Sequence, residues 1–194
     1  MIASVLCRTA NGYDINGLGQ LKDGRGNICP VTIIMPTVAM ETKEKVDKRV
    51  ANSKKTFTEE EIQKLYVEEF LKYLDIKISD AKDMLIERFN WICSQPPESA
   101  KFMYENNVMV GYDGKDIRSA LKHGTLAVGL IGMAETLQIL IGEDQTCDNG
   151  LELAKKICQL YKDRCDEFKH KYSLNFGVYF TPEHNKYCLW GLAQ

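Results

Sequence analysis

The sequence lacks the patterns that would assign it to a metal-dependent or membrane class directly. Its three histidines have no HxxxH or HExxH spacing, and its seven cysteines include no CxxC pair. These absences argue against a metal site. No run of 18 apolar residues is present, so the sequence predicts no transmembrane helix. The opening residues are too poor in basic and apolar positions to suggest a signal peptide.

The sequence also lacks an excess of charge of either sign, because its 25 basic and 27 acidic residues nearly balance. The net charge is −2 and the isoelectric point is about 6.0, which predicts neither a nucleic-acid partner nor attachment to an anionic membrane. The composition, 44% hydrophobic and 27% charged, is that of a globular protein, and 194 residues fit one domain. An odd, scattered set of cysteines indicates reduced thiols, most of them small buried side chains, in a cytoplasmic protein.

The first third of the chain begins with irregular backbone. Residues 5–30 contain five glycines and no long apolar run, which predicts a loop. Residues 31–40 are apolar and β-branched, and predict a buried strand that ends near Pro36. Residues 41–55 are charged and predict a surface helix or a linker.

A long helical stretch follows. Thr58 and Glu61 have the spacing of a capping box, and apolar residues recur at helical spacing as far as Pro96. The sequence "DIKISD" predicts a break into two helices, with Ser79 as the second cap.

The remaining residues alternate between short elements and helices. Residues 108–113 predict a strand or an extended turn, and 116–124 a short helix. The second half of 125–142 predicts a buried helix, 150–173 an amphipathic helix, and 174–182 a strand. This order predicts an α/β layer or part of an α/β barrel.

Four places carry residues that could do chemistry, and each also has a plain structural interpretation. Cys7 precedes Arg8, whose charge would favour a thiolate, but it could equally be a packing cysteine. The glycine-rich stretch "DGRGN" could bind an anion or form a surface turn. Gly124 and Thr125 could hold a phosphate before the predicted buried helix, or permit close packing. The turn "FTPEH" could bind a ligand or simply end a strand.

Three stretches, in this order, resemble the catalytic core of anaerobic (class III) ribonucleoside-triphosphate reductases. They are "LCRT…GYDINGLGQLKDGRGNICPVTIIMPTVAM", "KHGTLAVGLIGMAETLQILIG" and "YSLNFGVYFTP". The resemblance implies a ten-stranded α/β barrel of the glycyl-radical enzyme type around a finger loop with a cysteine at its tip. This chain would form half of that barrel as a single domain. The finger loop and strand would occupy residues 1–40, a helical insertion 41–107, and helices with a terminal strand 108–194.

The resemblance also implies a role for individual residues. Cys7, followed by Arg8 and Thr9, would form a thiyl radical that takes the 3′ hydrogen of a ribonucleoside triphosphate, after which the 2′ hydroxyl leaves as water. Asn27 would hydrogen-bond the ribose hydroxyls. Such an oxidoreductase supplies deoxyribonucleotides for DNA replication. The implied contacts to substrate come from Arg8, Thr9, Gly124, Thr125, Thr181, Pro182 and Glu183, the last in a loop one residue shorter than the family's TPAE pattern.

The family's radical machinery is not found in this sequence. The resemblance implies a glycyl radical in a C-terminal part, generated by an activase with an iron–sulfur cluster and S-adenosylmethionine. We expect no cofactor in this chain itself. The expected partners are ribonucleoside triphosphates, the remaining reductase segments and the activase, and a homodimer is left open. We therefore expect a fragment that is inactive alone.

Two alternatives remain open from the sequence. The chain could be a non-catalytic nucleotide-binding or assembly module derived from the same barrel. It could also belong to another glycyl-radical enzyme, such as a formate-lyase-like protein. Those enzymes tend to carry adjacent cysteines at the finger tip, where this chain has Leu6-Cys7-Arg8.

Overall fold

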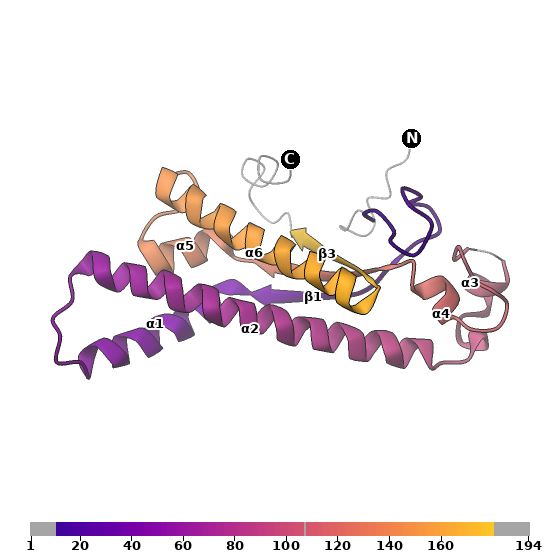
Figure 1. The fold of residues 1–194 in the computed structure, drawn as a ribbon, viewed down its shortest axis with the longest axis horizontal. Helices are drawn as coiled ribbons and strands as arrows, with labels where there is room; N and C mark the ends of the chain where they lie inside the picture. Colours follow the sequence, from indigo (N-terminus) through magenta and orange to yellow (C-terminus); the bar gives the residue numbers. More distant parts are fainter. Residues whose placement is uncertain (1–10, 107, 181–194) are drawn as a thin grey trace. The chain divides into compact units, whose positions relative to one another are not determined.

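The chain folds as alternating strands and helices. The computed structural model describes residues 11–106 and 108–180. Its strands form one parallel sheet in the order β1-β2-β3, which confirms the predicted α/β class (Figure 1). The elements are β1 (Asn27–Ile34), α1 (Met35–Ala51), α2 (Glu59–Cys93), the 3₁₀ turn η1 (Pro97–Ala100), α3 (Lys101–Glu105), α4 (Arg118–Leu121), β2 (Thr125–Ile131), α5 (Met133–Ile141), α6 (Asp148–Tyr172) and β3 (Asn175–Phe180).

The described residues divide into two compact units. The loop unit contains residues 11–31, 80–106, 108–129 and 162–179, and the hairpin unit contains 32–79, 130–161 and 180. The loop unit therefore holds the N-terminal parts of all the strands, together with the loop that precedes β1. The hairpin unit holds α1, the first half of α2, and α5.

The boundary between β1 and α1 differs from the prediction. β1 begins at Asn27 and ends at Ile34, and α1 starts at Met35 with Pro36 in its first turn. Proline is tolerated there because the first N–H groups of a helix have no partner within the helix. The strand expected to end near Pro36 ends at Ile34, but it begins at Asn27, within the predicted loop. The surface helix predicted at 41–55 begins earlier, within the apolar run.

The predicted break in the long helix is wrong, because α2 runs without interruption from Glu59 to Cys93. Its buried side chains recur every three or four residues through "DIKISD", so one apolar stripe continues past Ser79. The stripe consists of Tyr66, Phe70, Leu74, Ile78, Ala81, Leu85 and Phe89. Despite this length, no described helix is long and apolar enough to cross a membrane.

The predicted capping box at the start of α2 is confirmed. Glu61 N donates to Thr58 Oγ1 at 3.2 Å, and Thr58 N donates to Glu61 Oε2 at 3.0 Å. The two hydrogen bonds satisfy backbone donors that the first turn would otherwise leave open.

The apolar stretch 125–142 contains a strand as well as the expected helix. β2 ends at Ile131, and α5 begins at Met133, which confirms the helix in the second half. Gly132 joins them with φ +83°, a conformation that favours glycine, and a Cβ there would lie 2.4 Å from Pro36 Cγ.

The amphipathic helix predicted at 150–173 is confirmed as α6, which buries Leu153, Ile157, Tyr161, Cys165 and Phe168. In the loop unit, the Phe168 ring meets Phe176 of β3 edge-to-face at 5.5 Å. Cys158 and Cys165 are buried free thiols, as the sequence indicated, whereas Cys147 is exposed. Burial raises the pKa of Cys165 to about 12.

Candidate functional site

The loop from residue 11 to 26 precedes β1 and has little regular structure, as predicted. Its one bridge pairs Asp14 with Gly19, and Asp14 N donates to Gly19 O at 2.8 Å. Gly17 and Gly19 have φ values of +111° and +56°, so the turn between them depends on glycine. A backbone of this kind leaves many polar groups without partners, and side chains must supply them.

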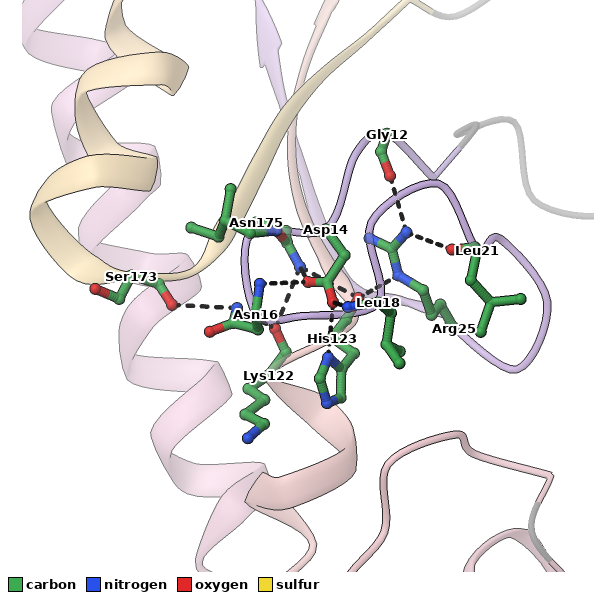
Figure 2. A network of polar contacts seen from close by, with 11 residues as sticks. Gly12, Asp14, Asn16, Leu18, Leu21, Arg25, Lys122, His123, Ser173 and Asn175 are labelled. Carbon is green, nitrogen blue, oxygen red and sulfur yellow. Dashed lines mark hydrogen bonds and ion pairs between the residues drawn. The ribbon is translucent and has the colours of Figure 1, made fainter.

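The Asp14 carboxylate supplies four of these contacts from the centre of the loop (Figure 2). Within the loop, Oδ1 accepts from Asn16 N at 3.1 Å and Oδ2 from Leu18 N at 2.9 Å. From outside it, Asn175 Nδ2 donates to Oδ1 at 2.6 Å and His123 Nδ1 contacts Oδ2 at 2.8 Å. Asp14 therefore joins the loop to the start of β3 and to the turn before β2.

Asp14 is ionised despite its burial. Only 1% of the residue is exposed. Burial alone would raise its pKa, but hydrogen bonds from Asn175, His123, Leu18 N and Asn16 N together lower it to about 2. An ionised carboxylate only accepts hydrogen bonds, so His123 Nδ1 must carry the shared hydrogen.

Arg25 holds the same loop through backbone carbonyls. Its Nε donates to His123 O at 2.6 Å, and its Nη1 donates to Gly12 O at 2.8 Å and Leu21 O at 2.7 Å. The residue is 7% exposed, and Nη2 has no hydrogen-bond partner among the described residues. The guanidinium thus fixes both sides of the loop against the turn that ends at His123.

Three asparagines complete the network. Asn11 Nδ2 donates to Arg25 O at 2.9 Å, and Asn16 Nδ2 donates to Lys122 O at 3.0 Å. Asn175 Oδ1 accepts from Ile15 N at 3.0 Å. The loop is therefore bound to the segments that lead into β2 and β3 at several points along its length (Figure 2).

Three predicted site residues lie together beside this loop. Asn27 begins β1, and Gly124 and Thr125 stand at the start of β2. Thr125 N donates to Gly26 O at 2.9 Å, so Asn27 and Thr125 begin neighbouring strands. The structure thus brings these three residues to the same end of the sheet, where β1 and β2 begin.

The expected helix N-terminus at Gly124 and Thr125 is wrong, because a strand follows them. Gly124 N donates to Leu121 O at 2.9 Å, and the Thr125 hydroxyl donates to Asn11 Oδ1 at 3.0 Å. No free N–H pair is therefore directed at an anion here. The need for glycine at 124 comes from close packing, since a Cβ would lie 2.9 Å from Gly26 O.

A small cavity of about 180 Å³ opens beside Thr125 in the loop unit. Its polar lining includes Tyr13, Lys169 and Asn175. Lys169 Nζ contacts Asp166 Oδ1 at 2.6 Å on the same helix, and Asn175 is already fully engaged in the network. The cavity is large enough for a phosphate-sized group and too small for a whole nucleotide.

Several predicted residues lie outside the described part of the chain. These are Cys7, Arg8, Thr9, Thr181, Pro182 and Glu183. Within residues 11–106 and 108–180, no three side chains of His, Cys, Asp or Glu gather as they would to hold a metal ion.

The residues at the centre of the network were missed by sequence reasoning. Asp14 and Asn175 are 161 positions apart, and the spacing of His123 was weighed only for a metal site. One local signal was available for Asp14. Asp14 is the first residue of "DINGLG". An aspartate in such a loop commonly accepts a hydrogen bond from the backbone N–H two residues later, which forms an Asx turn.

Comparison with known proteins places the whole chain in one family. A family model described as "Anaerobic ribonucleoside-triphosphate reductase" matches residues 1–186. The anaerobic ribonucleoside-triphosphate reductases of Escherichia coli K12 and Salmonella typhimurium LT2 are 26% and 25% identical to this chain over 199 positions. In each case the match covers 97% of this chain and 25% of the relative, so the chain spans about a quarter of these relatives' length.

Solved structures agree in fold. The anaerobic ribonucleotide reductase from Thermotoga maritima with citrate in the active site aligns with a TM-score of 0.54 at 16% identity, covering 84% of this chain and 25% of that one. The same enzyme with dATP bound in the specificity site aligns with a TM-score of 0.53 at 16% identity, covering 88% and 25%. At such identities the likeness concerns the fold alone. With the family match extending over nearly every residue, the chain belongs to the anaerobic ribonucleoside-triphosphate reductase family.

Proposed function

We propose that this chain forms part of the catalytic core of an anaerobic oxidoreductase that converts ribonucleoside triphosphates to deoxyribonucleotides. The observation that carries the proposal is the family match over residues 1–186, which includes Cys7, the anchored loop and the start of β2. The two units would belong to one ten-stranded barrel domain whose remaining strands come from other segments of the assembled cytoplasmic enzyme. The activity is therefore that of the assembly rather than of this chain alone.

The anchored loop supports a reactive role for Cys7. Asn11 is bonded to Thr125 and to Arg25 O, and Cys7 lies four positions before Asn11 in the sequence. Asn11 therefore links the segment that follows Cys7 in the sequence to the end of the sheet where Asn27 and Thr125 begin their strands.

The proposed chemistry divides between this chain and its partners. Cys7 would give its thiol hydrogen atom to a glycyl radical in another segment, one that an activase with an iron–sulfur cluster and S-adenosylmethionine would generate, and would so become a thiyl radical. The Cys7 thiyl radical would take the hydrogen atom from C3′ of the ribose, and the 2′ hydroxyl would take up a proton and leave as water. A two-electron reductant, either formate or a thiol protein, would then reduce C2′, and Cys7 would return a hydrogen atom to C3′. Asn27 holds the ribose hydroxyls in place during this step.

Substrate contacts are proposed for the residues that flank these groups. Arg8, Thr9, Thr181, Pro182 and Glu183 would contact the nucleotide together with Gly124 and Thr125. Because the Thr125 hydroxyl donates to Asn11, its contact with a phosphate requires the hydroxyl to turn from Asn11 to the substrate. A triphosphate would place one phosphate in the cavity beside Thr125.

Complementation tests the catalytic proposal. The chain is combined anaerobically with the missing reductase segments and the activase, and deoxyribonucleotide formation is compared between wild type, Cys7→Ser and Cys147→Ser. Cys147 is an exposed free thiol and serves as the matched control. We expect product with wild type and Cys147→Ser and none with Cys7→Ser. Equal product from Cys7→Ser would exclude the thiyl role.

The cavity beside Thr125 also favours a second candidate, a nucleotide-binding module without chemistry. Calorimetry with nucleoside triphosphates would then show binding to the chain alone, weakened by Thr125→Val and unchanged by Thr146→Val. Thr146 is an exposed residue of the hairpin unit, where its hydroxyl also hydrogen-bonds a neighbour. Absence of binding at millimolar nucleotide would exclude this candidate.

A further inference from the structure

A second cavity of the loop unit lies outside the site described above. Its volume is about 660 Å³, and all of its lining comes from residues 97–115, which form η1, α3 and the turn that follows them. Cavities that bind small organic ligands commonly have volumes of about 300–1,000 Å³. This cavity shares no lining residue with the one beside Thr125, so the proposed nucleotide contacts leave it unused.

Two tyrosines line this cavity side by side. The ring centroids of Tyr104 and Tyr112 lie 5.1 Å apart, and the ring planes are tilted by 45°. Tyr104 is only 6% exposed, yet its hydroxyl makes no hydrogen bond to another residue within 11–106 and 108–180. Buried tyrosine hydroxyls usually have a hydrogen-bond partner. The cavity therefore offers a ligand both aromatic surface and a hydroxyl that lacks a partner in the described chain.

The charged side chains of the lining are mostly acidic. They are Glu98, Glu105 and Asp113, with Lys115 as the only cation of the described lining. Glu98 makes no hydrogen bond or ion pair with another described residue. Burial, and then the charges of nearby carboxylates that include these three, raise the pKa of Tyr112. Their negative charge therefore acts on the tyrosine wall of the cavity.

The turn that carries Asp113 fixes this carboxylate in place. Asp113 Oδ1 accepts from Lys115 N and from Asp116 N, each at 2.9 Å, and Asp113 N donates to Ser119 Oγ at 3.0 Å. The two backbone hydrogen bonds lower the pKa of Asp113, so the carboxylate is ionised at neutral pH. This side of the cavity is therefore formed and charged before any ligand binds.

The lining fits an organic cation better than a metal ion. No three His, Cys, Asp or Glu side chains of the described residues gather as metal ligands. A guanidinium group, in contrast, stacks on aromatic rings and forms charge-assisted hydrogen bonds with carboxylates. We propose that this cavity binds a guanidinium group, with Glu98 and Glu105 as its carboxylate partners and the Tyr104 hydroxyl as a further acceptor. The group would belong to an arginine side chain of a protein partner or to a small free guanidine compound. The proposed reductase chemistry is not involved, because its residues lie elsewhere in the chain.

The first experiment compares methylguanidinium with its uncharged isostere methylurea on the full chain. The tyrosine rings are labelled with ¹³C and followed by NMR at constant ionic strength, and Tyr13, an exposed residue of the same unit, is the reference. Methylguanidinium should shift the Tyr104 and Tyr112 signals in the millimolar range and leave Tyr13 unchanged, whereas methylurea should shift none. Equal shifts with methylurea, or no shift at tens of millimolar methylguanidinium, would overturn the proposal.

Charge substitutions at exposed positions should change the affinity in opposite directions. Glu98→Gln should weaken methylguanidinium binding about threefold, and Lys115→Gln should strengthen it about twofold. Glu87→Gln is the matched control, because Glu87 is an exposed glutamate of α2 in the same unit, outside the cavity lining. Equal affinities of the Glu98→Gln and Glu87→Gln variants would exclude Glu98 as a partner and overturn the proposal.

Tyr104→Phe tests the hydroxyl while keeping the ring. Because this hydroxyl has no partner among the described residues, the variant should unfold at the same urea concentration as wild type but bind methylguanidinium about threefold more weakly. Unchanged affinity would exclude the proposed hydrogen bond to Tyr104.

A longer ligand distinguishes the two sources of the guanidinium group. N-acetylarginine amide has the same charge as methylguanidinium and adds the side-chain methylenes and a peptide backbone. Binding about tenfold tighter than that of methylguanidinium would support an arginine side chain of a protein partner. Equal affinity would support a small free guanidine compound, and exclusion of both ligands from the cavity would overturn the proposal.

Discussion

Buried ionic and amide side chains hold the backbone of the loop unit, whereas the core of the hairpin unit is apolar and its ionic contacts lie at the surface. In the loop unit, Asp14 and Arg25 are both nearly inaccessible to water. In the hairpin unit, α1 and α2 bury side chains such as Val46, Phe70 and Leu74, while Lys48 pairs with Glu44 on the exposed face at 2.6 Å.

The difference follows from how each backbone satisfies its polar groups. The helices of the hairpin unit pair their N–H and C=O groups internally, so their side chains are free to build an apolar core. The irregular loop has no such ladder, and its carbonyls and amides need side-chain partners. Arg25 alone bonds three carbonyls. The irregular backbone of this loop thus requires a polar core of its own.

The largest expected loss of stability comes from removing the centre of the polar network. Asp14→Ala leaves His123 Nδ1 and two backbone N–H groups without an acceptor, and it removes the shortest of the three hydrogen bonds from Asn175 Nδ2. Each unsatisfied buried donor costs about 1–3 kcal/mol, and we expect a total loss of about 4 kcal/mol in urea unfolding. The exposed Asp113→Ala is the control, with a loss below about 1 kcal/mol. Equal losses would mean that burial of the network adds nothing.

The apolar core of the hairpin unit should respond nearly as strongly but by another mechanism. Leu74 is fully buried on α2, and Leu74→Ala should lower the free energy of unfolding by about 3 kcal/mol through lost burial and a cavity. Ile76, on the same helix, is largely exposed, and Ile76→Ala should change stability by less than about 0.5 kcal/mol. The Leu74→Ala loss should be the same at pH 7 and pH 4.

Acid should weaken the loop unit selectively. The pKa of Asp14 is about 2 in the folded chain against an ordinary value of 3.8, so the folded state favours the ionised carboxylate. This stabilisation is complete above pH 4 and is lost as the pH falls through about 2, a loss of about 2 kcal/mol. Urea unfolding of wild type and Asp14→Asn across this range should show the difference between them shrink. A constant difference would contradict an ionised Asp14.

The smallest effect is expected at a polar contact in the hairpin unit. The Tyr66 hydroxyl donates to Asp47 Oδ1 beside the apolar core, and burial with the adjacent carboxylate raises the pKa of Tyr66 to about 12. Tyr66→Phe should cost about 1 kcal/mol and remove one late-titrating tyrosine from the ultraviolet absorbance titration. Tyr73→Phe is the control, because the Tyr73 hydroxyl bonds Glu41 in an exposed position. A larger loss at Tyr73 would reverse the expected order.

Much of the fold could be predicted from local patterns. The capping box at Thr58 and the amphipathic α6 are encoded by residues a few positions apart, and both were correct. The break expected at Ser79 was wrong, because Leu74, Ile78 and Ala81 continue the buried stripe through "DIKISD". Local propensity suggested a boundary that tertiary packing removed.

The candidate site could be predicted only in part. The family resemblance identified Asn27 and Thr125, which the structure places on neighbouring strands. The helix expected after Gly124 was wrong because a short apolar run fits a strand and a helix equally well. The partners of Asp14 could not be predicted, since no pattern in a single sequence pairs an aspartate with a histidine and an asparagine so far away.

Those separations have a consequence for the order of folding. Asp14 meets His123 across 109 positions and Asn175 across 161. Contacts between such distant positions form only after a large loss of chain entropy, whereas α1, α2 and α6 require only local contacts. During synthesis, Asp14 leaves the ribosome well before His123 and Asn175, which hold it in the folded chain. The loop before β1 is therefore made long before the side chains that hold it in place.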